Sequence, residues 1–224
     1  MNLKHNIMKT TTTFWTFFTT NQKTIANLQN EPDSTYKRID TQLERKLKNY
    51  CHHLDYLLFF PKRKTEKPQI IITANGNPLY FKYVENLVKS APKIKNWEIK
   101  AFVQPSSIIE KMKQGLDDPY IFCDLVLKTS ELKFAQLNPY DQKKKLDIIV
   151  YLKDYTIYCD NSILLEAIFM ILYDLLGEKS MVEDLNFVQL GQMPVDNINL
   201  VELHELQAYI EKINSQAIHK KIKL

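Results

Sequence analysis

Hydrophobic residues recur at helical spacing in several stretches of the chain, and this pattern is the first guide to its structure. The period is clearest at Leu43, Leu47, Tyr50 and Leu54, which follow one another at intervals of four, three and four. Thr41 and Glu44 match a capping box at the start of this stretch, so we expect a helix that begins near Thr41. Similar patterns predict helices over residues 12–28, 78–91, 163–176 and 199–214.

Shorter apolar or alternating runs between these helices predict strands. They cover residues 57–60, 69–73, 97–103, 120–128, 146–152, 155–158 and 186–190. The run QIIIT at residues 69–73 is continuous and β-branched, which is typical of a central strand. Hairpin, helix and strand follow one another from residue 57 to 103 and again from residue 120 to 190, an order compatible with a duplicated ββαβ unit. We therefore expect an α+β fold with a mixed, mainly antiparallel sheet packed by helices.

The length of 224 residues favours a single domain over residues 1–224. We expect N-terminal helices over about residues 12–56 and a sheet-and-helix body over residues 57–191. A C-terminal helix over about residues 199–214 and a basic tail complete this organisation.

Three segments need separate interpretation. Residues 105–119 fit either a loop or a short helix, and we expect residues 132–145 to form a loop or an irregular insertion. The helix at residues 163–176 is apolar nearly all round, so we predict that it is the most buried helix of the protein.

Glycine is scarce in this chain, which holds only Gly76, Gly115, Gly177 and Gly191. A loop that cradles phosphate needs several glycines within about eight residues, because the backbone must approach the anion closely and adopt positive φ. These four lie at least fourteen positions apart. We therefore expect no bound nucleotide and no other cofactor, and we expect each glycine to serve a turn or the end of an element.

The cysteines and the apolar runs bear on the cellular compartment. Cys51, Cys123 and Cys159 are an odd number with no close pair, which favours a reducing compartment over a disulfide framework. The most apolar run, at residues 163–176, is too short and too charged to span a bilayer. The sequence therefore predicts a cytoplasmic protein without membrane association.

The net charge of +4 is unevenly distributed along the chain. Residues 1–152 hold 24 Lys and Arg against 15 Asp and Glu, residues 153–205 hold 2 against 10, and residues 206–224 hold 4 against 1. Solvated faces account for such a pattern. A surface with one acidic and one basic lobe, which steers a charged partner, accounts for it as well.

No residues stand at the spacing of a recognisable metal or nucleophile site. Cys51, His52 and His53 are contiguous, but adjacent helical residues point about 100° apart, so the triplet is a poor chelator and we expect no metal. No serine lies in a GxSxG elbow, and the spacing selects no Cys–His pair. We interpret His204 as a flanking residue of the last predicted helix rather than as a base.

Carboxylates lie close together in the sequence at Asp117 and Asp118, at Glu183 and Asp184, and at Glu202 and Glu205. General acid–base catalysis needs two carboxyls that converge with separated pKa values. We interpret the first pair as part of a turn and the second as part of a loop, and we take Glu202 as the capping-box partner of Asn199. Catalytic residues stay unknown, and a hydrolase or other enzyme with a site built from distant residues stays an alternative.

Clustered lysines make binding of single-stranded nucleic acid a further alternative. Lys62, Arg63, Lys64 and Lys67 lie in one predicted hairpin turn, and more lysines lie at residues 143–145 and at the C-terminus. The aromatic residues that would stack on bases are Phe59, Phe60, Tyr151, Tyr155 and Tyr158. Core packing explains these aromatics equally well, and arginine, which favours base readout, is scarce.

Several segments of the chain resemble an uncharacterised family of bacterial proteins. They are FWTFF with Asn21, IIITANGNPLYFKYVENLVKSAP, NWEIKAFVQP, LDIIVYL, and ILYDLLGE ending at Glu178. The segments occur in the family's order and span nearly the whole chain. The resemblance implies a soluble bacterial α+β protein, and it brings no activity and no catalytic residues.

The absence of a chemical motif and the segregated charge favour a protein-interaction or regulatory module whose partner is another protein. The acidic stretch after residue 152 suits a basic partner, by analogy with immunity proteins and inhibitors of nucleases or toxins.

Overall fold

The structure of the chain, a computed structural model, describes residues 3–61, 63, 65–138, 145–196 and 199–222. Its contacts divide the chain into two compact units, unit 1 over Met1–Val103 and unit 2 over Gln104–Leu224. Both units combine helices with strands, and the strand pairs are mostly antiparallel, which confirms the predicted α+β class. The expected single domain over residues 1–224 stays a prediction.

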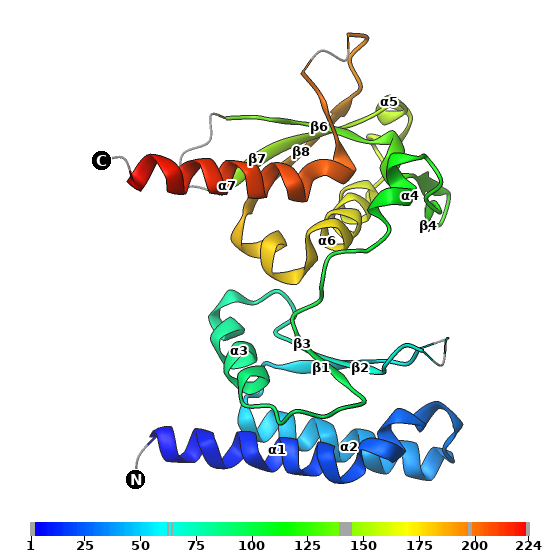
Figure 1. Cartoon of the computed structure of the whole chain (residues 1–224). Coiled ribbons are helices and arrows are strands. Elements are labelled where there is room, and N and C mark those ends of the chain that lie inside the picture. The colour runs from blue at the N-terminus through cyan, green and yellow to red at the C-terminus, as the bar shows by residue number, and fades with distance from the viewer. Residues whose placement is uncertain (1–2, 62, 64, 139–144, 197–198, 223–224) are drawn as a thin grey trace. The chain divides into compact units, whose positions relative to one another are not determined.

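Unit 1 begins with two helices that pack against each other on one side of the sheet (Figure 1). They are α1 at Leu3–Ala26 and α2 at Asp33–Tyr50, joined through a 3-10 turn, η1, at Leu28–Asn30. Their buried apolar side chains include Phe14, Phe18 and Ile25 of α1 and Ile39, Leu43 and Leu47 of α2. Because α2 begins well before Thr41, the expected capping box is wrong. Pro32 precedes the helix, and Asp33 places the negative charge that a helix N-terminus favours.

The sheet of unit 1 has three strands in the order β1-β2-β3. Their bounds are Asp55–Phe59, Gln69–Thr73 and Glu98–Ala101. β2 is antiparallel to β1 and parallel to β3, so QIIIT is the central strand, as predicted. The crossover passes through a 3-10 turn, η2, at Pro78–Tyr80 and through α3 at Phe81–Lys89. Asn77 Oδ1 accepts the N–H of Leu79 at 3.1 Å and so caps the turn that begins at Pro78.

Trp15 connects α1 to the βαβ part of unit 1. Its buried indole N–H donates to the carbonyl of Leu87 in α3 at 2.9 Å. Edge-to-face ring contacts join it to Phe14 and Phe18, and Phe18 in turn contacts Trp97 just before β3. The aromatic residues of the FWTFF segment thus form part of the hydrophobic core of unit 1.

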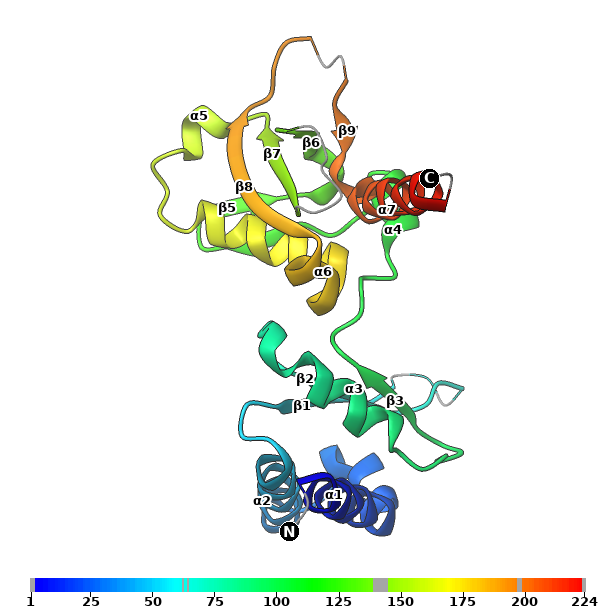
Figure 2. The same cartoon turned by 90° about the vertical axis from the view of Figure 1, so that its left-hand side faces the viewer.

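Unit 2 contains a four-stranded sheet, a separate hairpin and several helices (Figure 2). The helices are α4 at Ile109–Lys113, α5 at Tyr155–Tyr158, α6 at Leu164–Glu183 and α7 at Leu206–Ile222, with 3-10 turns η3 at Thr129–Glu131 and η4 at Leu203–Glu205. The hairpin consists of β4 at Tyr120–Phe122 and β5 at Leu125–Leu127. The sheet has the order β8-β7-β6-β9, and its strands are β6 at Lys133–Gln136, β7 at Leu146–Leu152, β8 at Leu185–Gln192 and β9 at Val201–Glu202.

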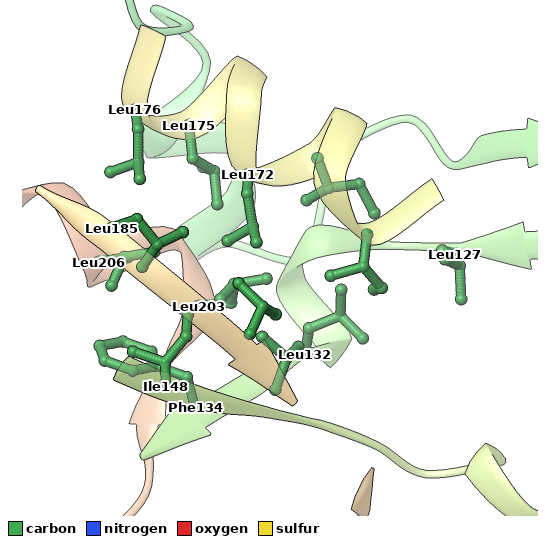
Figure 3. Packing of buried hydrophobic residues seen from close by; sticks show 14 of the residues in the cluster. Leu127, Leu132, Phe134, Ile148, Leu172, Leu175, Leu176, Leu185, Leu203 and Leu206 are labelled. Atoms are coloured by element: carbon green, nitrogen blue, oxygen red, sulfur yellow. The ribbon is translucent and has the colours of Figure 1, made fainter. Parts of the chain in front are cut away.

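The core of unit 2 lies between α6 and the inner face of this sheet. Leu172, Leu175 and Leu176 extend from α6 toward the strands that carry Ile148 and Leu185 (Figure 3). Burial alternates along β7, with every second residue from Leu146 to Leu152 inside. One face of β7 therefore packs into the core of unit 2, and the other face points away from it.

The two units share a ββαβ topology. In unit 1 the order is β1, β2, α3, β3, and in unit 2 it is β6, β7, α6, β8. In each, the first two strands are antiparallel and the helix crosses over to a strand parallel to the second. The first strand of the second set differs from our expectation, because it lies at Lys133–Gln136, within the segment that we expected to form a loop over residues 132–145.

Three expectations for unit 2 are corrected by the structure. Residues 120–128 form the β4–β5 hairpin rather than one strand, and residues 155–158 form the short helix α5 rather than a strand. Asn199 caps no helix, because β9 and η4 precede α7. Residues 105–119 contain the short helix α4.

α6 departs from the expected helix in length and in burial. Gly177 has the positive φ of 70° that suits a helix end, yet helical structure resumes after it and continues to Glu183. Among the described side chains, α6 carries more buried residues than any other helix, as expected. It is nevertheless open on one side, where Leu165, Phe169 and Met170 are 44%, 39% and 55% exposed.

Candidate functional site: the free edge of β1

β1 is an edge strand of unit 1, and the hydrogen bonds of its neighbour show which backbone groups face outward. The carbonyls of Pro68 and Ile72 accept the N–H groups of Glu98 and Phe102 at 3.0 and 2.8 Å. The even-numbered positions of β2 therefore direct their backbone groups toward β3. The odd-numbered positions direct theirs toward β1, because orientation alternates along a strand.

The register shows which residues of β1 direct their backbone N–H and C=O groups toward the free edge. Asp55, Leu57 and Phe59 stand opposite the odd-numbered positions of β2 and complete the ladder. Tyr56 and Leu58 consequently direct their N–H and C=O groups away from the sheet. In agreement with this orientation, the N–H of Tyr56 donates to the Asp55 carboxylate at 2.9 Å. The edge thus presents backbone donors and acceptors of the kind that pair with an added strand.

A groove of about 320 Å³ runs beside this edge. Tyr36, Asp40 and Glu44, which are spaced four residues apart on α2, line it opposite Asp55–Leu58 of β1, and Leu28 and Phe60 complete the lining. The hydroxyl of Tyr56 donates to Asp40 Oδ1 at 2.5 Å and so connects the two walls. Burial raises the pKa of Tyr56, and the hydrogen bond to Asp40 and the nearby carboxylates raise it further, so the hydroxyl stays a donor.

Two further grooves continue from the first around the hairpin end of the sheet. One has a volume of about 730 Å³ and is lined by Phe59, Phe60, Arg63 and Lys67, among others. The other has a volume of about 490 Å³ and is lined by Lys67, Lys93, Lys95 and Trp97, among others. Phe60 lines the first and second grooves and Lys67 lines the second and third, so the three form one surface, which we call the β1 groove.

Charge changes sign along the β1 groove. Asp40, Glu44 and Asp55 line its first part, whereas Lys67 and Lys95 lie in the parts beyond Phe60. The aromatic middle is open to solvent, since Phe59 is 51% exposed. The middle part carries both signs, because Glu66 and Glu98 line it together with Arg63 and Lys67. A ligand that follows the whole groove therefore meets carboxylates first, then aromatic rings among mixed charges, and then the amines of Lys93 and Lys95.

The uneven charge along the sequence coincides with the two units. Unit 1 holds 17 Lys and Arg against 8 Asp and Glu, a net charge of +9. Unit 2 holds 13 against 18, a net charge of −5. The segregation thus belongs to separate folded bodies, each with its own field.

The other long strand edges are better protected than that of β1. β3 carries an ion pair between Lys100 and Glu98, whose Nζ and Oε2 atoms lie 3.3 Å apart. β8 exposes Phe187 as well as polar side chains, and Gln192 at its end accepts the N–H of Thr156 at 3.1 Å. Charged and polar side chains discourage pairing at an edge. β1 exposes two apolar side chains, Leu57 and Phe59, which point away from α2 because Tyr56 points toward it.

The residues that we weighed as metal ligands do not converge. Cys51 is buried at the end of α2, while His52 and His53 lie exposed in the following turn. The ring of His53 stacks on Tyr80 with centroids 4.0 Å apart. Within the described ranges of the chain, no group of three or more His, Cys, Asp or Glu residues could hold a metal ion.

The other two cysteines are exposed and lie in unit 2. Cys123 occupies the tight turn between β4 and β5 with a φ of 56°, so it does not lie within a strand as the range 120–128 implied. Cys159 follows α5, and its Sγ lies 3.5 Å from the carbonyl of Thr156. Among the described residues, neither is hydrogen-bonded to a histidine.

The carboxylates that we weighed for catalysis have separate structural partners. Asp117 is buried rather than solvated, and its Oδ2 accepts the N–H of Ser130 at 3.2 Å. Asp184 Oδ2 accepts the hydroxyl of Ser180 at 2.6 Å. Glu202 pairs with Lys133 across β9 and β6, so its expected capping-box role with Asn199 is wrong.

His204 is buried in η4, which directly precedes α7, so it lies at the start of the last helix and not on its side. Its Nδ1 atom has no hydrogen-bond partner among the described residues, and the same holds for Oδ1 of Asp117 and Oγ1 of Thr129. These buried polar atoms lie in unit 2, away from any groove described above.

The basic cluster is only partly covered by the described residues. Lys62, Lys64, Lys143, Lys144 and Lys223 lie outside them, as do the side chains of residues 216–222. Lys145 donates to the carbonyl of Val182 at 2.7 Å in unit 2. Tyr155 and Tyr158 pack against the core of unit 2. The part of the cluster that faces a groove is therefore Arg63 and Lys67, together with Phe59 and Phe60.

The sequence analysis did not identify Asp40 and Glu44 of α2 as residues that line the β1 groove. Tyr36, Asp40 and Glu44 recur at a spacing of four residues, which is the signal of one helical face. Placing the start of the helix at Thr41 concealed that spacing. Lys93 and Lys95 were likewise missed, because only the crossover through α3 brings them beside Lys67.

Comparison of the chain with protein-family models, with curated proteins and with solved structures finds no match. The resemblance to a bacterial family therefore stays a prediction. Among the described residues, no helix combines the length and the apolar character needed to cross a membrane.

Proposed function

We propose that this protein is an interaction module that binds an extended segment of a partner protein along the β1 groove, as a strand added to the edge of β1. The orientation of the Tyr56 and Leu58 backbone away from the sheet carries this proposal. Main-chain hydrogen bonds give affinity in this binding mode, and side-chain pockets beside the edge give specificity.

The groove beside the edge supplies such pockets. An added strand points alternate side chains to its two faces. On the α2 side they meet Tyr36 and the Tyr56–Asp40 pair, and on the other side they meet the exposed Leu57 and Phe59. Burial of these apolar groups adds to the main-chain hydrogen bonds.

The charges along the groove favour a polypeptide over a nucleic acid. Asp40, Glu44 and Asp55 repel phosphates at the part of the groove where Tyr56 and Leu58 direct backbone groups away from the sheet. A peptide matches both signs, with Lys or Arg near Asp55 and with Asp or Glu near Lys67. Binding of single-stranded nucleic acid would use only the basic part.

The regulatory setting of this module is part of the same proposal. Three free cysteines suit a reducing cytoplasm. The resemblance suits a bacterial source. Control of a partner by occupation of its extended segment fits the analogy with inhibitors and immunity proteins.

The proposal is tested by selecting random displayed peptides on the immobilised full-length chain. We expect the selected peptides to be extended, with apolar residues between a basic end and an acidic end, and to slow amide hydrogen exchange at Leu58. Phe59→Lys is expected to lower the affinity of the chain for the selected peptides about tenfold. Ile121→Lys, which replaces a comparably exposed apolar residue on β4, is the matched control and is expected to leave affinity unchanged.

Two outcomes contradict the proposal. One is peptide binding that leaves exchange at Leu58 unchanged. The other is preferential binding of single-stranded DNA with a steep salt dependence, which would favour the nucleic-acid alternative.

A further inference from the structure

α6 of unit 2 exposes an unusual surface. Six residues occupy the exposed half of its circumference: Leu165, Glu166, Phe169, Met170, Tyr173 and Asp174. Four of the six are large and apolar or aromatic. We call these six residues the outer face of α6.

A helix that only covers a core normally carries polar residues on its solvent side. The inner side of α6 already packs against the sheet, because Leu172, Leu175 and Leu176 are buried in the core of unit 2 (Figure 3). The exposed Leu165, Phe169 and Met170 add nothing to that core. Contiguous exposed apolar groups of this kind mark interaction surfaces.

The charges around the outer face have one sign. Between residues 160 and 178 the chain holds no Lys or Arg, and its exposed carboxylates are Asp160, Glu166 and Asp174. Two of these, Glu166 and Asp174, are on the outer face itself, separated by two helical turns. Asp174 is held in place by Tyr120, whose hydroxyl donates to Oδ2 at 2.7 Å.

We propose that the outer face of α6 binds an amphipathic helix of a partner protein, one with an apolar stripe flanked by Lys and Arg. Helices pack through such stripes, with side chains of one helix entering the grooves of the other. The stripe covers Leu165, Phe169 and Met170, and the flanking cations meet Glu166 and Asp174. This surface is on unit 2 and does not depend on the β1 groove.

Charge also decides against the other occupants of an apolar helix face. Two copies of α6 packed through their outer faces would bring Glu166 and Asp174 of each copy together with no cation among the six residues of either face, which is destabilising. An anionic membrane would repel the same carboxylates. A basic helix is the occupant that gains from both the apolar and the charged parts.

The test uses the full-length chain and a designed probe. The probe is a labelled peptide of about 18 residues, or five helical turns, with a leucine stripe flanked by lysines, and its partner probe has glutamates in place of the lysines. We expect the lysine peptide to bind about tenfold more tightly than the glutamate peptide, as measured by fluorescence anisotropy. Equal affinity for both peptides would overturn the proposal.

Variants locate the binding to α6. Met170→Gln and Glu166→Lys are each expected to lower the affinity for the lysine peptide about fivefold or more. Phe187→Gln on β8, where the side chain is 53% exposed, is the matched control and is expected to have no effect. An equal loss in the control would overturn the location. Circular dichroism checks that each variant is folded.

Sedimentation of the free chain tests the second-copy alternative. We expect the sedimentation behaviour to be the same for the chain with Met170 and for Met170→Gln. A dimer that dissociates in the Met170→Gln variant would overturn the proposal in favour of self-association. Binding of vesicles with anionic lipids in preference to the peptide would overturn it in favour of a membrane.

Discussion

The hydroxyl of Tyr56 donates a hydrogen bond to Oδ1 of Asp40 at 2.5 Å and so joins the edge strand β1 to α2. The acceptor is a carboxylate in a half-buried setting, which makes this a strong kind of hydrogen bond. It holds the outward-facing part of β1 in place without using the backbone groups of the edge. The edge can therefore be ordered and still open to a partner.

Tyr56→Phe is expected to lower the free energy of unfolding by about 1–2 kcal/mol, because Asp40 loses a donor in a half-buried groove. Urea denaturation followed by far-UV circular dichroism measures the loss. Tyr36→Phe is the control, since the Tyr36 hydroxyl lines the same groove and bonds none of the described residues. Equal losses in the two variants would show that the bond contributes nothing specific.

The tyrosines predict a loss of stability at high pH. Burial raises the pKa of Tyr50 to about 12, and the charges of Cys51 and Tyr83 add to this. The unfolded value is about 10, so the folded state holds the proton more tightly. The stabilisation is present below pH 10 and is lost as the pH rises toward 12. Urea denaturation at pH 9, 10 and 11 should show the decline, and Tyr50→Phe should make it shallower. An unchanged slope in that variant would contradict the assignment.

Trp15→Phe is expected to lower the free energy of unfolding by about 1 kcal/mol, because the carbonyl of Leu87 loses the indole donor and keeps only the donors of Ser90. The aromatic packing against Phe14 and Phe18 is largely retained. Thermal denaturation followed by circular dichroism measures the effect. A variant as stable as the original chain would show that water replaces the indole at Leu87.

Gly115→Ala is expected to cost about 1–2 kcal/mol through the backbone alone. Gly115 has a φ of 68°, and an added Cβ would meet no atom within 4 Å. Gly115→Asn should cost less, because Asn adopts positive φ more readily than Ala. Melting temperatures of the two variants give the comparison. The opposite order would show that the side-chain environment, and not φ, governs this position.

The parts of the fold that local sequence defines were predicted well. The continuous run of β2 and the alternating run of β7 coincide with the observed strands. Asn77 and Pro78 mark the entry to the crossover helix because their side chains act on the neighbouring backbone. These signals do not depend on distant residues.

The elements that were missed depend on distant partners or on a turn without its usual residues. β6 has one buried side chain, Phe134, and is a strand because it pairs with β7 and β9. The turn of the β4–β5 hairpin places Cys123 at positive φ, where Asn or Gly is expected. At residues 155–158 the carbonyl of Asp154 accepts two N–H groups and starts a helix despite the alternating pattern.

The candidate site shows the same division. Arg63, Lys67, Phe59 and Phe60 were recognised because they are neighbours in the sequence. Asp40 and Glu44 were not, because nothing local connects α2 to β1.

The sequence by itself determined the α+β class, the central strand QIIIT, the lack of a glycine-rich phosphate loop and the separation of charge that later coincided with the two units. Only the tertiary structure decided that Tyr56 and Leu58 face a free edge and that Leu165, Phe169 and Met170 stay uncovered. The physical reason is that periodicity records which side chains avoid water. The register of a sheet, and whether an apolar face finds a partner, are set by contacts between residues far apart in the chain.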